Sequence, residues 1–447
     1  MTAETHARTL AFETLEMVIK DRAYSNIALN QTLQRKDLSQ ADKGLITEIV
    51  YGTLKRQYTL DYLLKPFIQT KLKRWVRILL WMSIYQYRYL DRIPTHAVIN
   101  EAVMIAKQRG GPHQGKIVNG ILRQITRSEL PDPMEIQDPK RRLSISYSLP
   151  MWMIEHWITH YGFEETERIA QSMLEHVAQT VRVNTAKIST SEAVQRLEEE
   201  GFSVEEDAEL DVCLHVSGGV IANSDSFREG LISIQDKSSM FVAHYLDPQI
   251  GDHILDACSA PGGKACHIGE LLRGTGQVTA TDIHQHKIAL IQENIHKLGL
   301  SHVKAMQHDA TTPYQEMYDR ILVDAPCSGL GVLRHKPEIK YTQSWDDIHQ
   351  LVDLQLEILE NVKHQLKPGG TLVYSTCTIE QLENENVIYT FLKQNSEFEF
   401  EPIEHPITHE QVKTLQILPQ DFDSDGFFIT RIKRKDKYCL LYTSPSP

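Results

Sequence analysis

Apolar residues in the first third of the chain recur at helical spacing. Ala11, Leu15 and Val18 occupy positions i, i+4 and i+7, which form one face of an amphipathic helix. A second pattern follows Pro94, where Thr95 is expected to cap a helix. The apolar face of that helix comprises Val98, Ala102, Val103 and Ala106. We therefore predict that the chain begins with an all-α domain.

The pattern changes after the turn-rich segment 131–139, which we interpret as a boundary. The all-α domain then covers residues 1–140, and a small α/β unit is predicted over residues 145–245. The expected helices of this unit are 151–161, 164–175 and 191–200, and the expected strands are 180–184 and 202–205.

From residue 251 onward, short β-rich runs alternate with helical stretches. The runs are 253–258, 277–282, 303–309, 320–324 and 371–377, and the helical stretches include 284–298 and 348–366. This alternation is typical of a doubly wound, mostly parallel sheet. We predict a Rossmann-like α/β domain over residues 246–434, with a last strand at 426–434. Residues 435–447 continue no pattern and are expected to be a tail outside the fold.

Length and composition agree with a multidomain globular chain. The 447 residues suit about three domains of roughly 150 residues. No apolar run reaches the roughly 18 residues that span a bilayer, and residues 1–10 lack the apolar core of a secretory signal. The six cysteines include no Cys-x-x-Cys pair, which argues against a disulfide framework or a structural metal. We expect a cytoplasmic protein with free thiols, no metal and no membrane association.

The net charge of −12 conceals a segregation of charge along the chain. Residues 1–142 carry 23 Lys and Arg against 14 Asp and Glu, and the remainder carries 24 against 45. A basic block of +9 on an acidic chain suggests that the N-terminal domain contacts a polyanion such as nucleic acid. The alternative is a solvated surface without a partner.

Two basic segments within that block are candidates for such a contact. Residues 71–77 place cations beside Trp75, and Arg109, Lys116, Arg123 and Arg127 flank the loop 110–112. Cations interleaved with aromatic rings suit a phosphate backbone with a stacking partner. Alternatively, Trp75 and Trp81 belong to the core and the cations extend into solvent, and the pattern does not decide between the two.

The loop after the first strand of the α/β domain is the most informative segment. Residues 256–264 have the sequence Asp-Ala-Cys-Ser-Ala-Pro-Gly-Gly-Lys, which is neither Gly-x-Gly-x-x-Gly nor a Gly-Lys-Ser/Thr phosphate loop. Gly262 and Gly263 lack Cβ atoms, so a ligand can approach the backbone closely. The helix that follows offers free N–H groups to an anion, here a carboxylate.

Aspartates at the next two strand ends extend this candidate site. Asp282 ends the second run, where dinucleotide folds place the acid that binds a ribose hydroxyl. Asp309 ends the third run and could contact the edge of a base. A nucleoside with a carboxylate and no phosphates fits S-adenosylmethionine better than NAD or ATP. One Asp at a strand end is as often a helix cap, but three in register with a Gly-Gly turn favour a cofactor site.

Two cysteines follow strands that end at the same predicted edge. Cys327 lies in Asp-Ala-Pro-Cys-Ser-Gly at 324–329, and Cys377 lies in Ser-Thr-Cys-Thr at 375–378. A lone Cys is usually a small buried hydrophobe, but a thiol at a ligand-binding edge is a credible nucleophile. Methylation at C5 of a pyrimidine needs such a group, because C5 becomes nucleophilic only after addition at C6. The spacing does not settle which cysteine attacks.

The segments 256–264, 324–329 and 375–378 resemble the RNA cytosine-C5 methyltransferases of the Nol1/Nop2/Sun family. The resemblance extends to 235–239, 334–337 and 425–428, and residues 1–140 look like a NusB-type helical RNA-binding domain with 116–123 as its last helix. This domain order is similar to the bacterial small-subunit rRNA methyltransferase B branch of the family. Ser259 and Cys266 stand where Ala and Thr are commoner.

The resemblance implies roles for these residues. Cys377 would add to C6 of the target cytosine, Cys327 would assist release of the product, and Asp324 would contact the cytosine edge near N3 and the cofactor. S-adenosylmethionine would be held by Cys258, Ser259, Ala260, Pro261, Gly262, Gly263, Lys264, Asp282, Asp309 and Asp324. The α/β unit at 145–245 would be an RNA-recognition-motif-like unit that binds RNA.

The implied substrate is 16S rRNA, naked or in a small-subunit assembly intermediate, bound by a monomer. A different class of protein, a non-catalytic NusB-like RNA-binding factor in ribosome assembly or antitermination, would explain the basic domain but not both cysteines. DNA cytosine methylation would make Cys327 the attacking residue and leave 375–378 unexplained.

Overall fold

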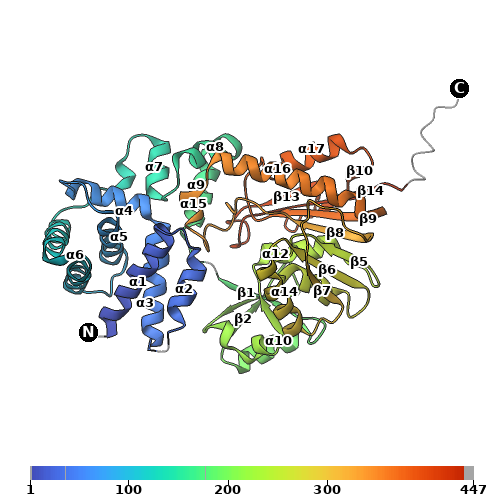
Figure 1. The fold of residues 1–447 in the computed structure, drawn as a ribbon, viewed down its shortest axis with the longest axis horizontal. Helices are drawn as coiled ribbons and strands as arrows, with labels where there is room; N and C mark the ends of the chain where they lie inside the picture. The colour runs from blue at the N-terminus through green and yellow to red at the C-terminus, as the bar shows by residue number, and fades with distance from the viewer. Residues whose placement is uncertain (1–2, 36, 177, 437–447) are drawn as a thin grey trace. The chain divides into compact units, whose positions relative to one another are not determined.

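The computed structural model of the chain describes residues 3–35, 37–176 and 178–436. The chain divides into two compact units, and Figure 1 labels most of their helices and strands. The first unit contains the residues up to Glu175 together with Leu333–Thr342, and the second contains the rest. Every helix of the described residues is too short or too polar to cross a membrane. The predicted tail lies outside the described residues from 437 onward.

The first unit is all-helical, as was predicted for residues 1–140. Ala11, Leu15 and Val18 are buried in one core, which confirms the helix face expected from their spacing. The helix after Pro94 begins at Thr95 as expected, but Pro94 itself occupies the N-cap position and no side chain caps the helix. The elements are α1 (Ala3–Ile19), α2 (Ser25–Leu33), α3 (Gln40–Lys55), α4 (Gln57–Leu64), η1 (Lys65–Phe67), α5 (Arg74–Tyr89), α6 (Thr95–Ile125), η2 (Pro133–Glu135), α7 (Pro139–Ser146), α8 (Met151–Tyr161), α9 (Phe163–Ser172) and α15 (Ile339–Thr342).

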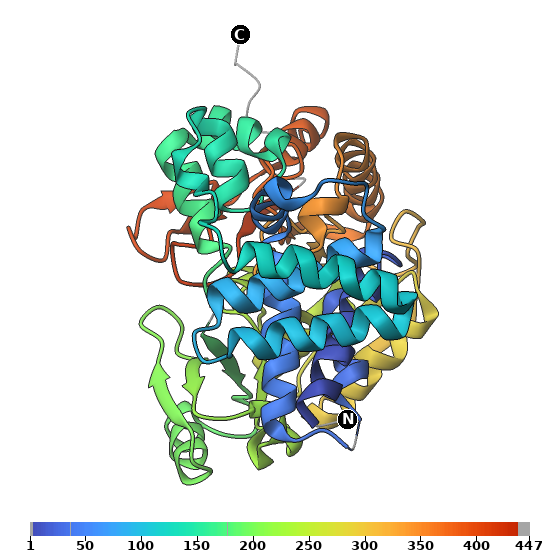
Figure 2. The ribbon, with the colours of Figure 1, turned by 90° about the vertical axis from the view of Figure 1, so that its left-hand side faces the viewer.

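Helix α6 is bent back on itself within the basic block. Gly111 has a φ of +79°, which interrupts the helix just before Pro112. The two halves of α6 lie side by side, as Figure 2 shows in teal, and a Cβ on Gly115 would lie 2.4 Å from the Lys107 side chain. The loop 110–112 is therefore a tight turn between two packed helices.

The second unit contains a small antiparallel sheet in the order β2-β3-β1-β4. Its elements are β1 (Gln179–Val183), α10 (Thr190–Glu199), β2 (Ser203–Glu206), β3 (Cys213–Ser217), η3 (Ile221–Asn223), α11 (Asp225–Arg228) and β4 (Ile232–Ile234). Val181, Leu197 and Leu214 are fully buried in its core. The strands expected at 180–184 and 202–205 and the helix expected at 191–200 are present within one or two residues of the predicted bounds.

The larger sheet of the second unit has the order β10-β14-β9-β8-β5-β6-β7, with β13 paired to β14. The pairs from β9 to β7 are all parallel, whereas β14, β13 and β10 are antiparallel. The strands are β5 (His253–Asp256), β6 (Gln277–Asp282), β7 (Val303–Gln307), β8 (Tyr318–Asp324), β9 (Leu366–Thr376), β10 (Phe398–Phe400), β13 (Thr414–Ile417) and β14 (Phe427–Arg434), and the short pair β11 (Ile403–Glu404) and β12 (Gln411–Val412) lies apart. The predicted Rossmann-like, mostly parallel sheet is confirmed.

Helices cover both faces of this sheet. They are α12 (Lys237–Leu246), α13 (Gly263–Leu271), α14 (Gln285–Leu298), α16 (Trp345–Val362), η4 (Lys363–Gln365) and α17 (Glu385–Gln394). Alternate strand residues enter opposite cores: Ile254 packs with α12, α13 and α14, and its neighbour Leu255 packs with α16 and α17. Strands buried on both faces explain why the β-rich runs are so apolar in the sequence.

Candidate active site

The carboxyl ends of the parallel strands form one edge of the large sheet. β5 leads to β6 on one side, whereas β8 and β9 lie on its other side. The strand order therefore reverses between β5 and β8, and open α/β sheets bind ligands at such a switch point. The loops after β5, β8 and β9 carry the three motifs singled out in the sequence.

The loop after β5 is shaped by its two glycines. Gly262 has a φ of +100° and directly precedes α13, so a side chain there would strain the backbone. A Cβ built on Gly263 meets no atom within 4 Å, so the first residue of α13 faces open space. The loop thus presents an uncrowded helix N-terminus, as predicted from residues 256–264.

Carboxylates converge around Cys258 in this loop. Burial raises the pKa of the Cys258 thiol well above its ordinary value, and the charges of four aspartates raise it further. These are Asp256, Asp324, Asp282 and Asp309, in decreasing order of effect. The structure therefore brings the predicted aspartates to one edge.

Asp282 and Asp309 also make local hydrogen bonds. Asp282 Oδ1 accepts from the backbone N–H of His284 at 3.0 Å. Asp309 Oδ1 accepts from both the backbone N–H and the hydroxyl of Thr311, which lower its pKa. Asp309 lies two residues beyond β7, which ends at Gln307, so it does not end a strand as predicted.

Asp324, at the end of β8, is held by two partners. Its Oδ2 lies 2.8 Å from Lys264 Nζ, and its Oδ1 accepts from the Ser375 hydroxyl at 2.9 Å. Burial alone would lower the pKa of Lys264, but the charge and hydrogen bond of Asp324, together with smaller contributions from Cys377 and Asp256, raise that pKa overall. The pair therefore links the loops after β5 and β8 to the end of β9.

The two candidate thiols are neighbours at this edge. Cys327 Sγ lies 3.4 Å from Cys377 Sγ, and both cysteines are free and partly exposed. The hydrogen bond to Cys377, and then burial, raise the pKa of Cys327 well above its ordinary value. Cys327 is therefore a protonated thiol at neutral pH, able to donate its hydrogen to the Cys377 sulfur.

Asp256 is a buried carboxyl whose ionisation costs stability. Burial, and then the charge of Asp324, raise the pKa of Asp256 to about 7. A carboxyl whose pKa is higher in the folded chain than in the unfolded chain stabilises the fold. This stabilisation is complete below the pKa of the unfolded chain and is lost as the pH rises through about 7. As the pH rises from about 5 to about 8, the melting temperature of the wild type should therefore fall relative to that of Asp256→Asn. The control Asp346→Asn, on an exposed residue of α16, should show no such gain, and a pH-independent difference for Asp256→Asn would contradict this account.

A buried polar cluster next to the two cysteines was not predicted from the sequence. Glu383 and Asn384 are fully buried, and they bond to residues adjacent to Cys327 and Cys377 respectively. The available signal was a Glu-Asn pair shortly after Cys377, in a loop between two apolar elements.

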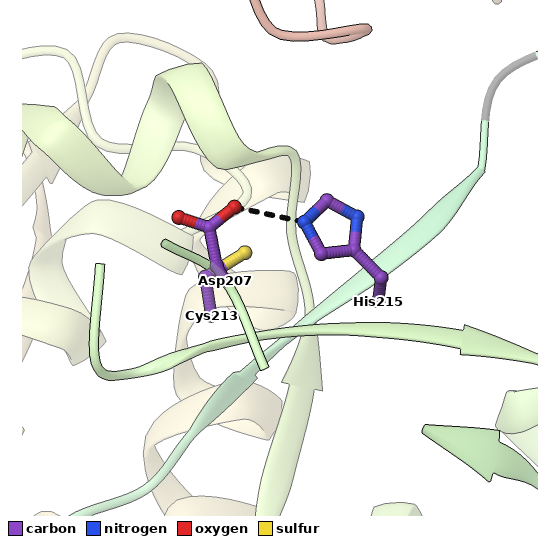
Figure 3. A group of neighbouring side chains, drawn as sticks. All are labelled: Asp207, Cys213 and His215. Atoms are coloured by element: carbon purple, nitrogen blue, oxygen red, sulfur yellow. Dashed lines mark hydrogen bonds and ion pairs between the residues drawn. The ribbon is translucent and has the colours of Figure 1, made fainter. Parts of the chain in front are cut away.

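A second cluster has the residue types of a metal site. Asp207, which follows β2, lies close to Cys213 and His215 of β3 (Figure 3). Asp207 Oδ2, however, is 2.8 Å from His215 Nε2 and 2.7 Å from Lys237 Nζ, and its Oδ1 accepts two backbone N–H bonds. Burial and the charge of Asp207 raise the pKa of Cys213, which opposes the thiolate that a metal requires. The Lys237 ammonium already supplies the positive charge, so the donor set does not fit a metal ion.

Some side chains of the basic segments pack or form hydrogen bonds within the first unit. Trp75 packs against the core, edge-on to Phe12, and Trp81 donates to Asp61 at 3.1 Å. Arg77 pairs with the same Asp61. The two tryptophans therefore pack within the helical unit, as the alternative interpretation of this segment expected, whereas Lys71 and Lys73 are exposed.

Comparison with known proteins defines the class. The family models for "16S rRNA methyltransferase RsmB/F", the NusB family and the "Methyltr_RsmF/B-like, ferredoxin-like domain" match residues 243–433, 5–127 and 149–222. A fold of this kind, with free thiols beside a Gly-Gly loop, is that of an RsmB/F-type methyltransferase with a NusB domain.

Full-length relatives identify the branch. The "Probable ribosomal RNA small subunit methyltransferase B" of Bacillus subtilis (strain 168) is 44% identical over 97% of this chain and 99% of its own length. The protein of the same name from Synechocystis is 35% identical over 96% and 99%. The crystal structure of PH0851 matches with a TM-score of 0.83 and 27% identity, over 97% of this chain and 99% of that one. The chain belongs to the ribosomal RNA small subunit methyltransferase B family, whose members are S-adenosylmethionine-dependent methyltransferases.

Proposed function

We propose that this chain transfers a methyl group from S-adenosyl-L-methionine to C5 of a specific cytosine in 16S rRNA, through a covalent cysteine–C6 adduct. The observation that carries the proposal is the pair of thiols, Cys327 and Cys377, 3.4 Å apart beside the Asp324–Lys264 pair. The relatives' names support the substrate class. Every invoked side chain comes from one chain, so a monomer suffices.

The loop after β5 fits the cofactor. The open space at Gly263 and the helix N-terminus beyond it suit a carboxylate. Asp282 at the end of β6 would serve the ribose, and Asp309, two residues beyond β7, would serve the base. Cys258, Ser259, Ala260, Pro261 and Lys264 complete the cradle, with Asp324 at its border. When bound, S-adenosylmethionine supplies the methyl group as an electrophile.

Cys377 is proposed as the nucleophile. Its sulfur would form a bond to C6 of the cytosine, and the C5=C6 electron pair would then form the bond from C5 to the methyl carbon. The bond between that carbon and the sulfonium sulfur of S-adenosylmethionine would break, which leaves S-adenosylhomocysteine. The S–H of Cys327 can donate to the attacking sulfur of Cys377, 3.4 Å away. Asp324 would face the cytosine edge near N3 and favour protonation there as negative charge develops.

Cys327 is proposed to complete the reaction. Once Cys377 is bound to C6, it no longer accepts the hydrogen bond that contributes most to raising the pKa of Cys327. Cys327 can then lose its proton to solvent and take the proton from C5. The C6–S bond breaks, the C5=C6 bond returns, and Cys377 leaves as a thiolate.

The first unit is proposed to place the enzyme on RNA. Its NusB family match and its charge of +9 over residues 1–142 support phosphate contacts, which position a protein without specifying sequence. The target cytosine must leave any stack to reach the thiols, which costs least in a loop or single strand. Naked 16S rRNA and a small-subunit assembly intermediate are both candidate substrates.

Replacement of the exposed lysines in the first basic segment, residues 71–77, tests whether the first unit binds RNA. Lys71→Ala with Lys73→Ala should weaken RNA binding and reduce the slope of log K against log salt by roughly 0.7–0.9 for each phosphate that the variant no longer neutralises. Binding measured by fluorescence anisotropy over a range of salt gives the slope. An unchanged slope would remove these lysines from the RNA-binding surface.

The test of the proposed function is methyl transfer from labelled S-adenosylmethionine to unmodified 16S rRNA and to small-subunit assembly intermediates, with the modified base mapped. The account predicts label at C5 of one cytosine. Label at another atom would overturn the C5 assignment, and label only in DNA would overturn the substrate. No label in any substrate would favour a non-catalytic RNA-binding factor.

A further inference from the structure

The two thiols lie on separate loops, and a buried cluster ties those loops together. Cys327 follows β8 and Cys377 follows β9, so neither strand alone fixes the distance between their sulfurs. The cluster consists of Ser328, Gln355, Thr376, Thr378, Glu383 and Asn384, all buried.

Glu383 holds the loop that carries Cys327. Its Oε1 accepts from the backbone N–H of Ser328 at 2.8 Å, and its Oε2 accepts from the Ser328 hydroxyl at 2.5 Å. Gln355 of α16 donates to the same Oε1 at 3.2 Å and to the Pro326 carbonyl at 2.9 Å. The residues on both sides of Cys327 are therefore bonded to this cluster.

Asn384 holds the loop that carries Cys377 in the same way. Its Oδ1 accepts from the Thr376 hydroxyl at 2.5 Å, and its Nδ2 donates to the Thr378 carbonyl at 2.9 Å. Thr378 also shares a hydrogen bond of 2.9 Å with Ser328, which joins the two loops directly. Glu383 and Asn384 are consecutive, so one short segment fixes both cysteines.

We propose that Glu383, with Asn384, is a positioning residue that sets the distance and orientation between Cys327 and Cys377. The role of this spacing in product release rests on the proposed function, whereas the spacing itself does not. Burial of Glu383 raises its pKa to about 6 against the opposing bonds from Ser328. The hydrogen bonds from Ser328 and Gln355 offset the cost of burying this carboxylate, which suits a positioning role.

The first experiment measures how fast Cys327 and Cys377 form a disulfide, without RNA or cofactor. Diamide oxidises two adjacent thiols to a disulfide: each sulfur gives up one electron and one proton, and diamide becomes the hydrazine. In the wild type, peptide mapping should find the Cys327–Cys377 disulfide. Glu383→Met, which keeps the length but removes both acceptors, should slow its formation by about tenfold, the scale of one weakened charge-assisted bond.

Matched variants separate positioning from general damage. Glu383→Gln keeps one carbonyl oxygen for the Ser328 N–H and should stay within about threefold of the wild type. Glu357→Met, on a residue of α16 outside the cluster, should not differ from the wild type. If Glu383→Met does not fold, Ser328→Ala removes the hydroxyl bonds to Glu383 and Thr378 and should slow oxidation in the same direction. A folded Glu383→Met that forms the disulfide at the wild-type rate would overturn the proposal. If Glu383→Met does not fold, disulfide formation at the wild-type rate by Ser328→Ala would overturn it instead.

The second experiment tests the link to catalysis. With 16S rRNA and S-adenosylmethionine, Glu383→Met should accumulate a protein–RNA adduct in denaturing gels, as Cys327→Ala is expected to do, with an unchanged KM for the cofactor and a lower kcat. If oxidation slows but neither variant forms an adduct, the positioning role stands and the covalent mechanism fails. If Cys327→Ala forms an adduct and Glu383→Met turns over like the wild type, Glu383 has no role in release.

Discussion

Cys377→Ala is expected to lower the rate of methyl transfer by at least about 10⁴-fold, the scale on which removal of a nucleophile acts in covalent catalysis. Without the sulfur, nothing adds to C6, and C5 of the cytosine stays unreactive. S-adenosylmethionine affinity, measured by calorimetry, should be unchanged, because the cradle of residues 258–264 does not include Cys377. Transfer of label to 16S rRNA measures the rate.

The matched control for this variant is Cys213→Ala. Cys213 is also a free cysteine but lies on β3 of the small sheet, whereas Cys377 follows β9 of the large sheet. It should methylate at the wild-type rate. Wild-type transfer by Cys377→Ala would contradict the assignment of the nucleophile.

Cys327→Ala is expected to trap the reaction after methyl transfer. The alanine cannot take the C5 proton, so the C6–S bond to Cys377 persists and the RNA stays attached. A slower band in denaturing gels, sensitive to ribonuclease, should appear with Cys327→Ala and be absent when Cys377 is also replaced. Turnover should fall by roughly 10²–10⁴-fold, the usual contribution of a proton-transfer group. Multiple turnover without an adduct would exclude Cys327 from release.

Much of the fold follows from patterns that are local in the sequence. Strand β6 has the predicted bounds, 277–282, because a continuous buried run between polar turns has few other solutions. The alternation of such runs with helices determines a parallel sheet, and a parallel sheet brings its carboxyl ends together. The motifs at 256–264, 324–329 and 375–378 could therefore be placed at one edge from the sequence alone.

Features that depend on distant contacts could not be predicted in this way. The segment Leu333–Thr342 belongs to the helical unit, where Lys340 Nζ donates to the Lys55 carbonyl at 2.8 Å and Ser25 N–H to Glu338 at 2.9 Å. Asp309 lies beyond β7 because this edge strand, mostly exposed, stops at Gln307. The burial of Glu383, a charged residue, could not be predicted because its hydrogen-bond partner Ser328 lies 55 positions earlier in the chain.

The domain boundaries predicted at 140, 145 and 245 stay predictions. Helices α7, α8 and α9 belong to the same compact unit as the residues before them, whereas β1 begins the second unit. The ferredoxin-like family model, at 149–222, spans both sides of that division. Apolar periodicity identifies each helix but not the unit on which it packs.

The central claim is that Cys377 bonds to C6 of a cytosine and Cys327 releases it. The most direct measurement is mass spectrometry of the complex trapped with Cys327→Ala, S-adenosylmethionine and 16S rRNA, after digestion with nuclease and protease. The account predicts a single modified peptide that carries a methylated cytidine nucleotide on Cys377. A nucleotide on any other residue, or a trapped complex in which Cys377 is unmodified, would contradict it.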